Sequence, residues 1–395
     1  MSVDTQESPG RLERCLARFG TDGAELREAI NRFVDVRRGD HVLAVGSLIE
    51  GLGNDKSDLD LLLITHEDDV GDEEGWVMGG RMVDLRSISA KTVAAMVDKL
   101  HRWVDQPWNL LELAPFSYDE RLLLHRLANG VEVVARPGDG PANDWLRPSV
   151  RDLCRLKLQV ARHLARTIQI DMVGYRRDGD YATMVLASQE LLGHGVDGLL
   201  AGFQLTNPNP KWRHRLLGRL PTHWNHELAV WPAEVPAQTA YWGCHRAPAE
   251  PAAGPSVSHA LRSVALTRAA FASVEPRLIA GRSMGAWPGG VVGQGSLRSE
   301  CLPALEFDVD FCLTGDGVAV ARLNEFGHAV SFTEDEFAVV LLCDGATPKD
   351  AAVQELSRRW GTAESASAPD VEATLTRVTA AGLCLETSGN GAVGV

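Results

Sequence analysis

The chain has 395 residues, of which 45% are hydrophobic and 23% charged, and its formal net charge is −14. This length predicts two or three domains with ample cores. The acidic balance argues against a protein that binds the nucleic-acid backbone with Lys and Arg, and no run of 18 apolar residues predicts a membrane span.

Neither the cysteines nor the first residues predict export. The seven cysteines are odd in number and form no C-x-x-C pair, so they indicate neither a zinc site nor a disulfide framework. The opening MSVDTQESPG lacks the basic-then-apolar layout of a signal peptide. We therefore expect a cytoplasmic protein.

Two amphipathic helices are the first predicted elements. Apolar residues recur at helical spacing from Leu12 to Phe19 and from Leu26 to Val34. Gly39-Asp40 then ends the second helix and leads into a strand. We expect the second helix to lie across the back of a sheet, where its apolar stripe is core.

The stretch from His41 to Thr65, HVLAVGSLIEGLGNDKSDLDLLLIT, predicts a strand, a Gly-Ser turn and a second strand. Asp58 and Asp60 share one face of the second strand, because alternate residues do. Neighbouring carboxylates repel each other, and a divalent cation such as Mg²⁺ relieves that repulsion. Gly46 lets the backbone approach an anion, and Ser47 can donate to phosphate oxygens.

A third carboxylate follows on a short strand, residues 81–88. The strand places its apolar residues on one face and Asp84 on the other. Two ions about 3.5–4 Å apart, bridged by carboxylates, activate an attacking oxygen and steady a leaving phosphate. Asp58, Asp60 and Asp84 therefore form a candidate two-magnesium set.

This constellation resembles the nucleotidyltransferases of the DNA polymerase β type, over about residues 25–135. Their signature is a Gly-Ser turn, a D-x-D pair roughly a dozen residues later, and a third acid on a neighbouring strand. The resemblance implies Gly46, Ser47, Lys56 and Ser57 for an NTP, with ATP expected, and Asp58, Asp60 and Asp84 as metal ligands and catalytic residues.

One departure from that family concerns the triphosphate. Many members carry a basic residue shortly after the Gly-Ser, whereas this chain has Leu48-Ile49-Glu50-Gly51. Triphosphate binding then depends on Lys56, Arg81, Arg86 or a residue further along. A degenerate domain that binds nucleotide, or nothing, stays open as an alternative.

A helical region follows a predicted helix at 90–104 and a short strand at 130–134. Long helices are predicted at 151–172 and 180–203, and they resemble the helical half that shapes the acceptor pocket in antibiotic-modifying nucleotidyltransferases. By that resemblance Glu190 is a candidate base, although Asp84 is the better default because a metal-bound carboxylate already lies at the attacking oxygen. Glu190 and His194 also read as an exposed i, i+4 pair.

A basic turn at residues 207–215 leads into a further helix. Lys211 in this turn is a candidate triphosphate ligand, and the alternative is a solvated helix start. The Pro/Ala-rich residues 246–256 predict a loop, residues 257–278 a helix, and the Gly-rich residues 283–298 a domain linker.

The last hundred residues predict a separate module. Strand-like runs at 307–313, 318–323 and 328–332 precede three helices, which is a winged-helix-like order. A capping box of Thr333 and Glu336 begins the first of these helices.

The strand pattern, FAVVLLCDGATPKDAAVQEL and DVEATLTRVTAAGLC resemble the PqqD-like peptide-recognition domains that serve makers of ribosomally synthesised, modified peptides. The resemblance implies that an extended leader peptide adds a strand beside the third strand. It assigns peptide binding to Ala329, Val330, Ser331, Phe332, Val371, Leu375 and Val378. Residues 301–395 hold 5 Lys/Arg against 15 Asp/Glu, a poor surface for DNA; a purely structural winged helix stays open.

Together these patterns predict an α+β chain with three domains: a polymerase β-like nucleotidyltransferase sheet with helices (1–145), a helical acceptor-side domain (146–300) and the PqqD-like module (301–390). The expected function is Mg²⁺-dependent transfer of NMP from an NTP to a precursor peptide, with release of pyrophosphate. The alternatives are nucleotidylation of a small hydroxylated molecule such as an antibiotic, and an inactive leader-peptide adaptor. Nucleic acid and membrane are not expected partners, and a homodimer stays open.

Overall fold

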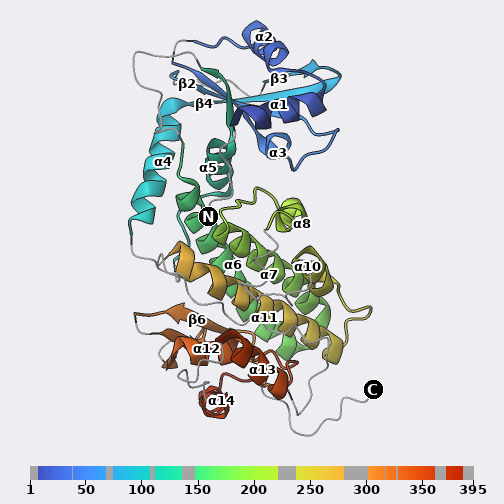
Figure 1. The fold of residues 1–395 in the computed structure, drawn as a ribbon, viewed down its shortest axis with the longest axis vertical. Coiled ribbons are helices and arrows are strands. Elements are labelled where there is room, and N and C mark those ends of the chain that lie inside the picture. The colour runs from blue at the N-terminus through green and yellow to red at the C-terminus, as the bar shows by residue number, and fades with distance from the viewer. Residues whose placement is uncertain are drawn as a thin grey trace. The chain divides into compact units, whose positions relative to one another are not determined.

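Two compact units make up the computed structural model of the chain (Figure 1). The structure describes residues 8–37, 39–67, 74–106, 112–135, 147–220, 237–279, 301–315, 317–325, 328–360 and 371–385. The first unit comprises Met1–Trp108 with Ala114–Leu156, and the second comprises Asn109–Leu113 with Lys157–Val395. The predicted linker at 283–298 lies outside the described residues.

The first unit is built on a five-stranded mixed sheet of order β3-β4-β2-β1-β5. Its elements are α1 (Ser8–Phe19), α2 (Gly23–Phe33), β1 (His41–Val45), α3 (Gly46–Ile49), β2 (Leu59–Thr65), β3 (Glu74–Met78), β4 (Arg81–Ser89), α4 (Ala90–Val104), α5 (Tyr118–Asn129) and β5 (Val131–Ala135). β1 is antiparallel to β2 and β5, β2 is parallel to β4, and β3 is antiparallel to β4.

The two faces of this sheet have different partners. Apolar side chains of α1, α2 and α3 form one core with alternate residues of the strands, among them Ala44, Leu61 and Val83. Helices α4 and α5 contact the strands from the other face. Because side chains alternate along a strand, Asp60 and Asp84 point away from the α1–α3 core and toward the face that α4 and α5 cover.

The second unit combines long helices with a three-stranded antiparallel sheet of order β6-β7-β8. Its elements are α6 (Val150–Asp178, which begins in the first unit), α7 (Tyr181–Gly202), η2 (Pro210–Trp212), α8 (Arg213–Leu217), α10 (Ala237–His245), α11 (Ala253–Leu278), β6 (Val309–Leu313), β7 (Val318–Arg322), β8 (Val330–Phe332), α12 (Glu334–Leu341), α13 (Lys349–Trp360) and α14 (Val371–Ala380). Helices α7 and α11 pack along each other at glycines: a Cβ at Gly198 would lie 2.4 Å from Phe271.

Buried ion pairs join the helices of this unit to β6. Asp310 lies 2.5 Å from Arg162 Nη1 and 2.5 Å from Arg166 Nε, and Arg162 Nε lies 2.5 Å from Glu275. Arg162, Asp310 and Glu275 are at most 2% exposed. The helical region and the C-terminal module, which the sequence predicts as two domains, therefore pack here as one unit.

The predicted fold class is confirmed: the structure is α+β, with a mixed sheet, many helices and a small second sheet. The three strands and three helices of the C-terminal module occur in the predicted order. The Gly-Ser turn is in fact the first turn of the short helix α3, and α11 begins at Ala253, inside the predicted loop at 246–256. No helix in the described part of the chain has the length and apolar character needed to cross a membrane.

Candidate functional site

Two of the three predicted acids lie side by side in the first sheet. Asp60 on β2 and Asp84 on β4 are partners in the parallel pairing, one strand apart at the same register. Adjacent in-register residues of neighbouring strands project to the same face, so both carboxylates share one surface. Asp58 comes just before β2, two residues from Asp60, and is exposed.

The Gly-Ser segment closely approaches this pair. Gly46 has a positive φ of +80°, and a Cβ built on it would lie 2.2 Å from Asp60 Oδ2. A side chain at residue 46 would therefore collide with the carboxylate, and the backbone angle itself favours glycine. Ser47 follows at the start of α3 and is half-buried. The Gly-Ser motif is thus a close-approach site against Asp60.

The charge around Asp60 is largely negative. Burial raises the pKa of this carboxyl, Arg126 opposes that shift, and Asp84, Asp58 and Glu50 raise the pKa further. Among the described residues, Arg126 on α5 pairs with this carboxylate, with its Nη2 3.6 Å from Asp60 Oδ1. Clustered acids of this kind are stabilised by a bound cation, because each carboxylate disfavours ionisation of the next.

The donor chemistry of this cluster fits Mg²⁺. Carboxylate oxygens are the ligands this ion prefers, and it is commonly held by one or two carboxylates together with substrate phosphates and water. Among the described residues, no three His, Cys, Asp or Glu side chains lie close enough together to hold a metal ion by themselves. Asp60 and Asp84, with Asp58 beside them, suit an ion that completes its shell from a nucleotide.

The other predicted nucleotide ligands in this unit are less well placed. Ser57 Oγ accepts the main-chain N–H of Asn54 at 2.9 Å and so closes its own loop, and Lys56 is exposed in that loop. Arg81 packs over the ring of Phe19 on α1, which belongs to the opposite face of the sheet. Arg86 is exposed and shares the face of Asp84, two residues away.

Glu190 and Lys211 belong to the second unit, so their roles at the carboxylate site stay predictions. Glu190 is 68% exposed and its Oε1 lies 3.8 Å from His194 Nε2 at i, i+4. Lys211 is exposed, with its ammonium 4.8 Å from the ring centroid of Trp212. Arg213 in the same basic turn is bound to Asp197 at 2.6 Å.

The residues assigned to peptide binding divide into an exposed and a buried group. Ala329 and Ser331 are exposed and Val330 is half-buried, along or just before the edge strand β8. The side chains of Phe332, Leu375 and Val378 are at most 6% exposed and belong to the module's core. Val371, at the start of α14, is half-buried.

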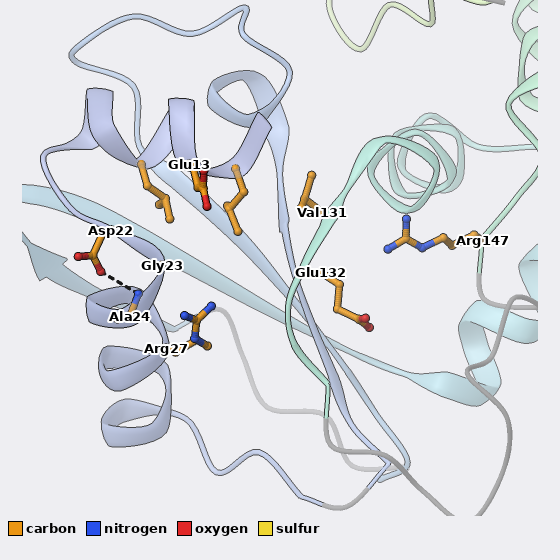
Figure 2. Close-up of a pocket in the computed structure, with 10 residues that line it drawn as sticks. Glu13, Asp22, Gly23, Ala24, Arg27, Val131, Glu132 and Arg147 are labelled. Carbon is orange, nitrogen blue, oxygen red and sulfur yellow. Dashed lines mark hydrogen bonds between the residues drawn. The ribbon is translucent and has the colours of Figure 1, made fainter. Parts of the chain in front are cut away.

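A cavity of about 600 Å³ in the first unit lies apart from the acids (Figure 2). It is lined by Leu12, Glu13, Leu16, Asp22, Gly23, Ala24, Arg27, Val131, Glu132 and Arg147. These residues come from α1, the start of α2, the edge strand β5 and the residues after it, and none belongs to the predicted nucleotide set. Its mixed charges indicate no single ligand class.

Two contacts at the site involve residues that sequence reasoning missed. Arg126 approaches Asp60, and the Nε2 of His125 lies 2.8 Å from Oε1 of Glu50, with both side chains at most 8% exposed. Both missed residues lie on α5, which the sequence analysis did not predict. The signal that was available is Glu50 itself, because it directly follows the apolar Leu48-Ile49 and a carboxylate that becomes buried requires a partner.

The comparisons with known proteins give limited guidance. No protein-family model and no curated protein sequence matches the chain. Among solved structures it is similar to a nucleotidyltransferase-like protein from Exiguobacterium sibiricum 255-15, at 13% identity and a TM-score of 0.34, over 66% of this chain and 81% of that chain. A TM-score of 0.34 is too low to support a functional inference, so the functional assignment depends on the site itself.

Proposed function

We propose that the chain is a nucleotidyltransferase that moves a nucleoside monophosphate from an NTP to an acceptor oxygen. The observation that carries the proposal is the in-register pairing of Asp60 with Asp84 beside Gly46, whose missing side chain leaves room against Asp60. Two carboxylates that face each other across neighbouring strands repel each other and destabilise a sheet. A sheet with a purely structural role would therefore not favour this pair.

The residues take distinct roles in this reaction. The Gly46 backbone and Ser47 hold the β- and γ-phosphates. Asp60 and Asp84, with Asp58 beside them, would hold magnesium together with the substrate phosphates, and the bound ion would supply positive charge at the attacking and leaving oxygens. Asp84 receives the proton of the acceptor hydroxyl as its oxygen bonds to the α-phosphorus, the bond from that phosphorus to the bridging oxygen breaks, and pyrophosphate leaves.

We further propose that the acceptor is a peptide that adds a strand to β8. The sheet has two edges, and the β6 edge is sealed: main-chain oxygens of Phe307, Val309 and Phe311 accept from side chains of α6 and α11. The donors are Gln169 Nε2 at 2.9 Å, Arg268 Nε at 2.9 Å and Arg162 Nη2 at 2.8 Å, in that order. An extended peptide requires an open edge, and among the described strands β8 forms the other edge.

Within the described part of the module, the exposed side chain of Arg377 contacts the β8 edge. Arg377 on α14 donates to the main-chain oxygen of Ser331, pairs with Glu336, and lies 4.7 Å over the ring of Phe332. The side chain of Arg377 is 42% exposed on a polar stretch of α14. Recognition at this edge would therefore depend on main-chain hydrogen bonds and on displacing Arg377, with little contribution from the buried Leu375 and Val378.

That burial also favours a second candidate, in which the acceptor is a small hydroxylated molecule and the module serves only in assembly. Three of the seven side chains assigned to peptide contact are core residues. Because these apolar side chains are buried, they offer little surface at β8 to a peptide that binds through an apolar groove.

Transfer of label from α-³²P-NTP tests these assignments. The wild type and an Asp58→Ala/Asp60→Ala variant are incubated with a precursor peptide encoded beside the chain's gene, and separately with hydroxylated small molecules. Label on the peptide that the double variant fails to transfer supports the main proposal, and label on small molecules alone supports the second. Absence of any transfer, with peptide binding intact, would leave an inactive adaptor.

A further inference from the structure

On the acid face of the first sheet, the guanidinium of Arg126 approaches Asp60. Arg126 Nη2 lies 3.6 Å from Asp60 Oδ1, and its side chain is 21% exposed. Of the other cations considered for the triphosphate, Arg81 is over Phe19 on the opposite face and Lys56 is in the exposed loop before β2. Arg86 shares the face of Asp84, but it lies two residues further along β4, where it pairs with Leu62 and not with Asp60. Arg126 is therefore the described cation best placed to act beside Asp60 and Gly46.

Helix α5 holds Arg126 in a fixed position. A capping box of Ser117 and Glu120 begins the helix. Near its end, the buried His125 contacts Glu50 directly after α3, and Gly130 packs so closely on β1 that a Cβ there would lie 3.0 Å from Val45. These contacts join the end of α5 to both sides of the Gly46 segment. The guanidinium is thus preorganised at the place where a phosphate would meet the Gly-Ser backbone.

We propose that Arg126 is the cationic triphosphate ligand of this site, beside the Gly46 backbone and Ser47, and that it neutralises Asp60 until metal and nucleotide arrive; this inference rests on the proposed function. Arginine suits the task because its planar fork donates two parallel hydrogen bonds to phosphate oxygens. Positive ions and Arg126 compete for the same carboxylate. When Asp60 is engaged by an ion, the guanidinium is released to the phosphates.

This competition gives predictions of opposite sign for one substitution. Arg126→Met keeps the aliphatic stem and removes the charge. Without nucleotide, the variant should bind Mn²⁺ several-fold more tightly than the wild type, because the competing cation is gone. With Mg²⁺ present, it should bind nucleotide roughly 10- to 100-fold more weakly, because charge-assisted hydrogen bonds to phosphate are lost.

The measurement uses Mn²⁺ electron paramagnetic resonance for the ion and calorimetry for the nucleotide. The probes are the non-transferable α,β-methylene analogues of ATP, GTP, CTP and UTP. Arg102→Met is the matched control, because Arg102 is an exposed arginine of the same unit whose Nη2 pairs with Asp98 at i, i+4. Arg126→Lys, which keeps the charge and loses the fork, should bind Mn²⁺ as the wild type does and nucleotide with intermediate affinity.

The outcomes separate this inference from the function on which it rests. A wild type that binds no analogue overturns the proposed function and the inference with it. A wild type that binds an analogue, with Arg126→Met binding it equally well, overturns the inference alone. If Arg126→Met weakens Mn²⁺ and nucleotide together, or only lowers thermal stability while Arg126→Lys restores it, the role of Arg126 is structural and the inference is wrong.

Discussion

Replacing Gly46 by alanine tests the close approach of the Gly46 backbone to the Asp60 carboxylate. Alanine at φ +80° costs about 1–2 kcal/mol of backbone strain. Its Cβ would lie 2.2 Å from Asp60 Oδ2, so Asp60 must rotate away. Overpacking of this kind adds about 1–3 kcal/mol. We expect Gly46→Ala to lower the free energy of unfolding and to abolish Mn²⁺ binding together, because the displaced carboxylate leaves the ion site.

Gly80→Ala is the matched control for this test. Gly80 has nearly the same positive φ, +78°, but no neighbouring atom within 4 Å of the added Cβ. It should therefore cost only the strain of about 1–2 kcal/mol and leave Mn²⁺ binding unchanged. Urea denaturation gives the stabilities and paramagnetic resonance gives the binding. Equal destabilisation by both substitutions, with Mn²⁺ still bound by Gly46→Ala, would refute the assigned contact.

Three further predictions concern the second unit. Asp310→Ala should lower the free energy of unfolding by about 3–5 kcal/mol in urea titrations, because it leaves two buried guanidiniums without their shared carboxylate. Gly198→Ala should destabilise by about 1–3 kcal/mol through its clash on α11, whereas Gly174→Ala, in open space on α6, should stabilise by up to about 1 kcal/mol. Burial lowers the pKa of His259 to about 4 from 6.5. Stability should therefore be complete above pH 6.5 and fall by about 3 kcal/mol toward pH 4, and denaturation of His259→Leu across that range should lack this loss.

The acid pair could be predicted from sequence because strands have a period of two. That period fixes the face of every second residue, and short apolar runs defined β2 and β4 well enough to place Asp60 and Asp84 on one surface. The parallel register that sets them side by side depends on how the strands pair, which the residues alone do not determine. The face was therefore predictable, and the direct pairing was a finding of the structure.

Arg126 could not be found in this way. It lies on α5, more than sixty residues from Asp60, in a helix whose apolar stripe (LLLHRL) is as typical of core as of a site wall. The same ambiguity affected α14. Val371, Leu375 and Val378 recur at helical spacing, which indicates one shared face but not whether that face meets a peptide or the module's own core. In the structure Leu375 and Val378 meet the core.

The charged residues of α6 show a third limit of pattern reading. The apolar stripe of this helix predicts its packing face but gives no indication of Arg162 and Arg166, which contact the buried Asp310 of β6. Long charged side chains are rarely fully buried without a partner, and a partner about 145 residues away leaves no local signal. The joining of the helices to the C-terminal module therefore became visible only in three dimensions.

The buried arginines do more than pair with acids, and this bears on the proposed peptide. Buried ion pairs alone are weak evidence of stability, since apolar residues of similar volume often replace them without loss. Arg162 and Arg268, however, also donate to main-chain oxygens along β6. A leucine at either position would leave those oxygens buried without a donor, at about 1–3 kcal/mol each, and would leave the edge unpaired. When the main-chain groups of one edge of a three-stranded sheet are already hydrogen-bonded, a further strand can add only at the other edge. The network that joins β6 to the helices therefore leaves β8 as the edge at which the proposed peptide would bind.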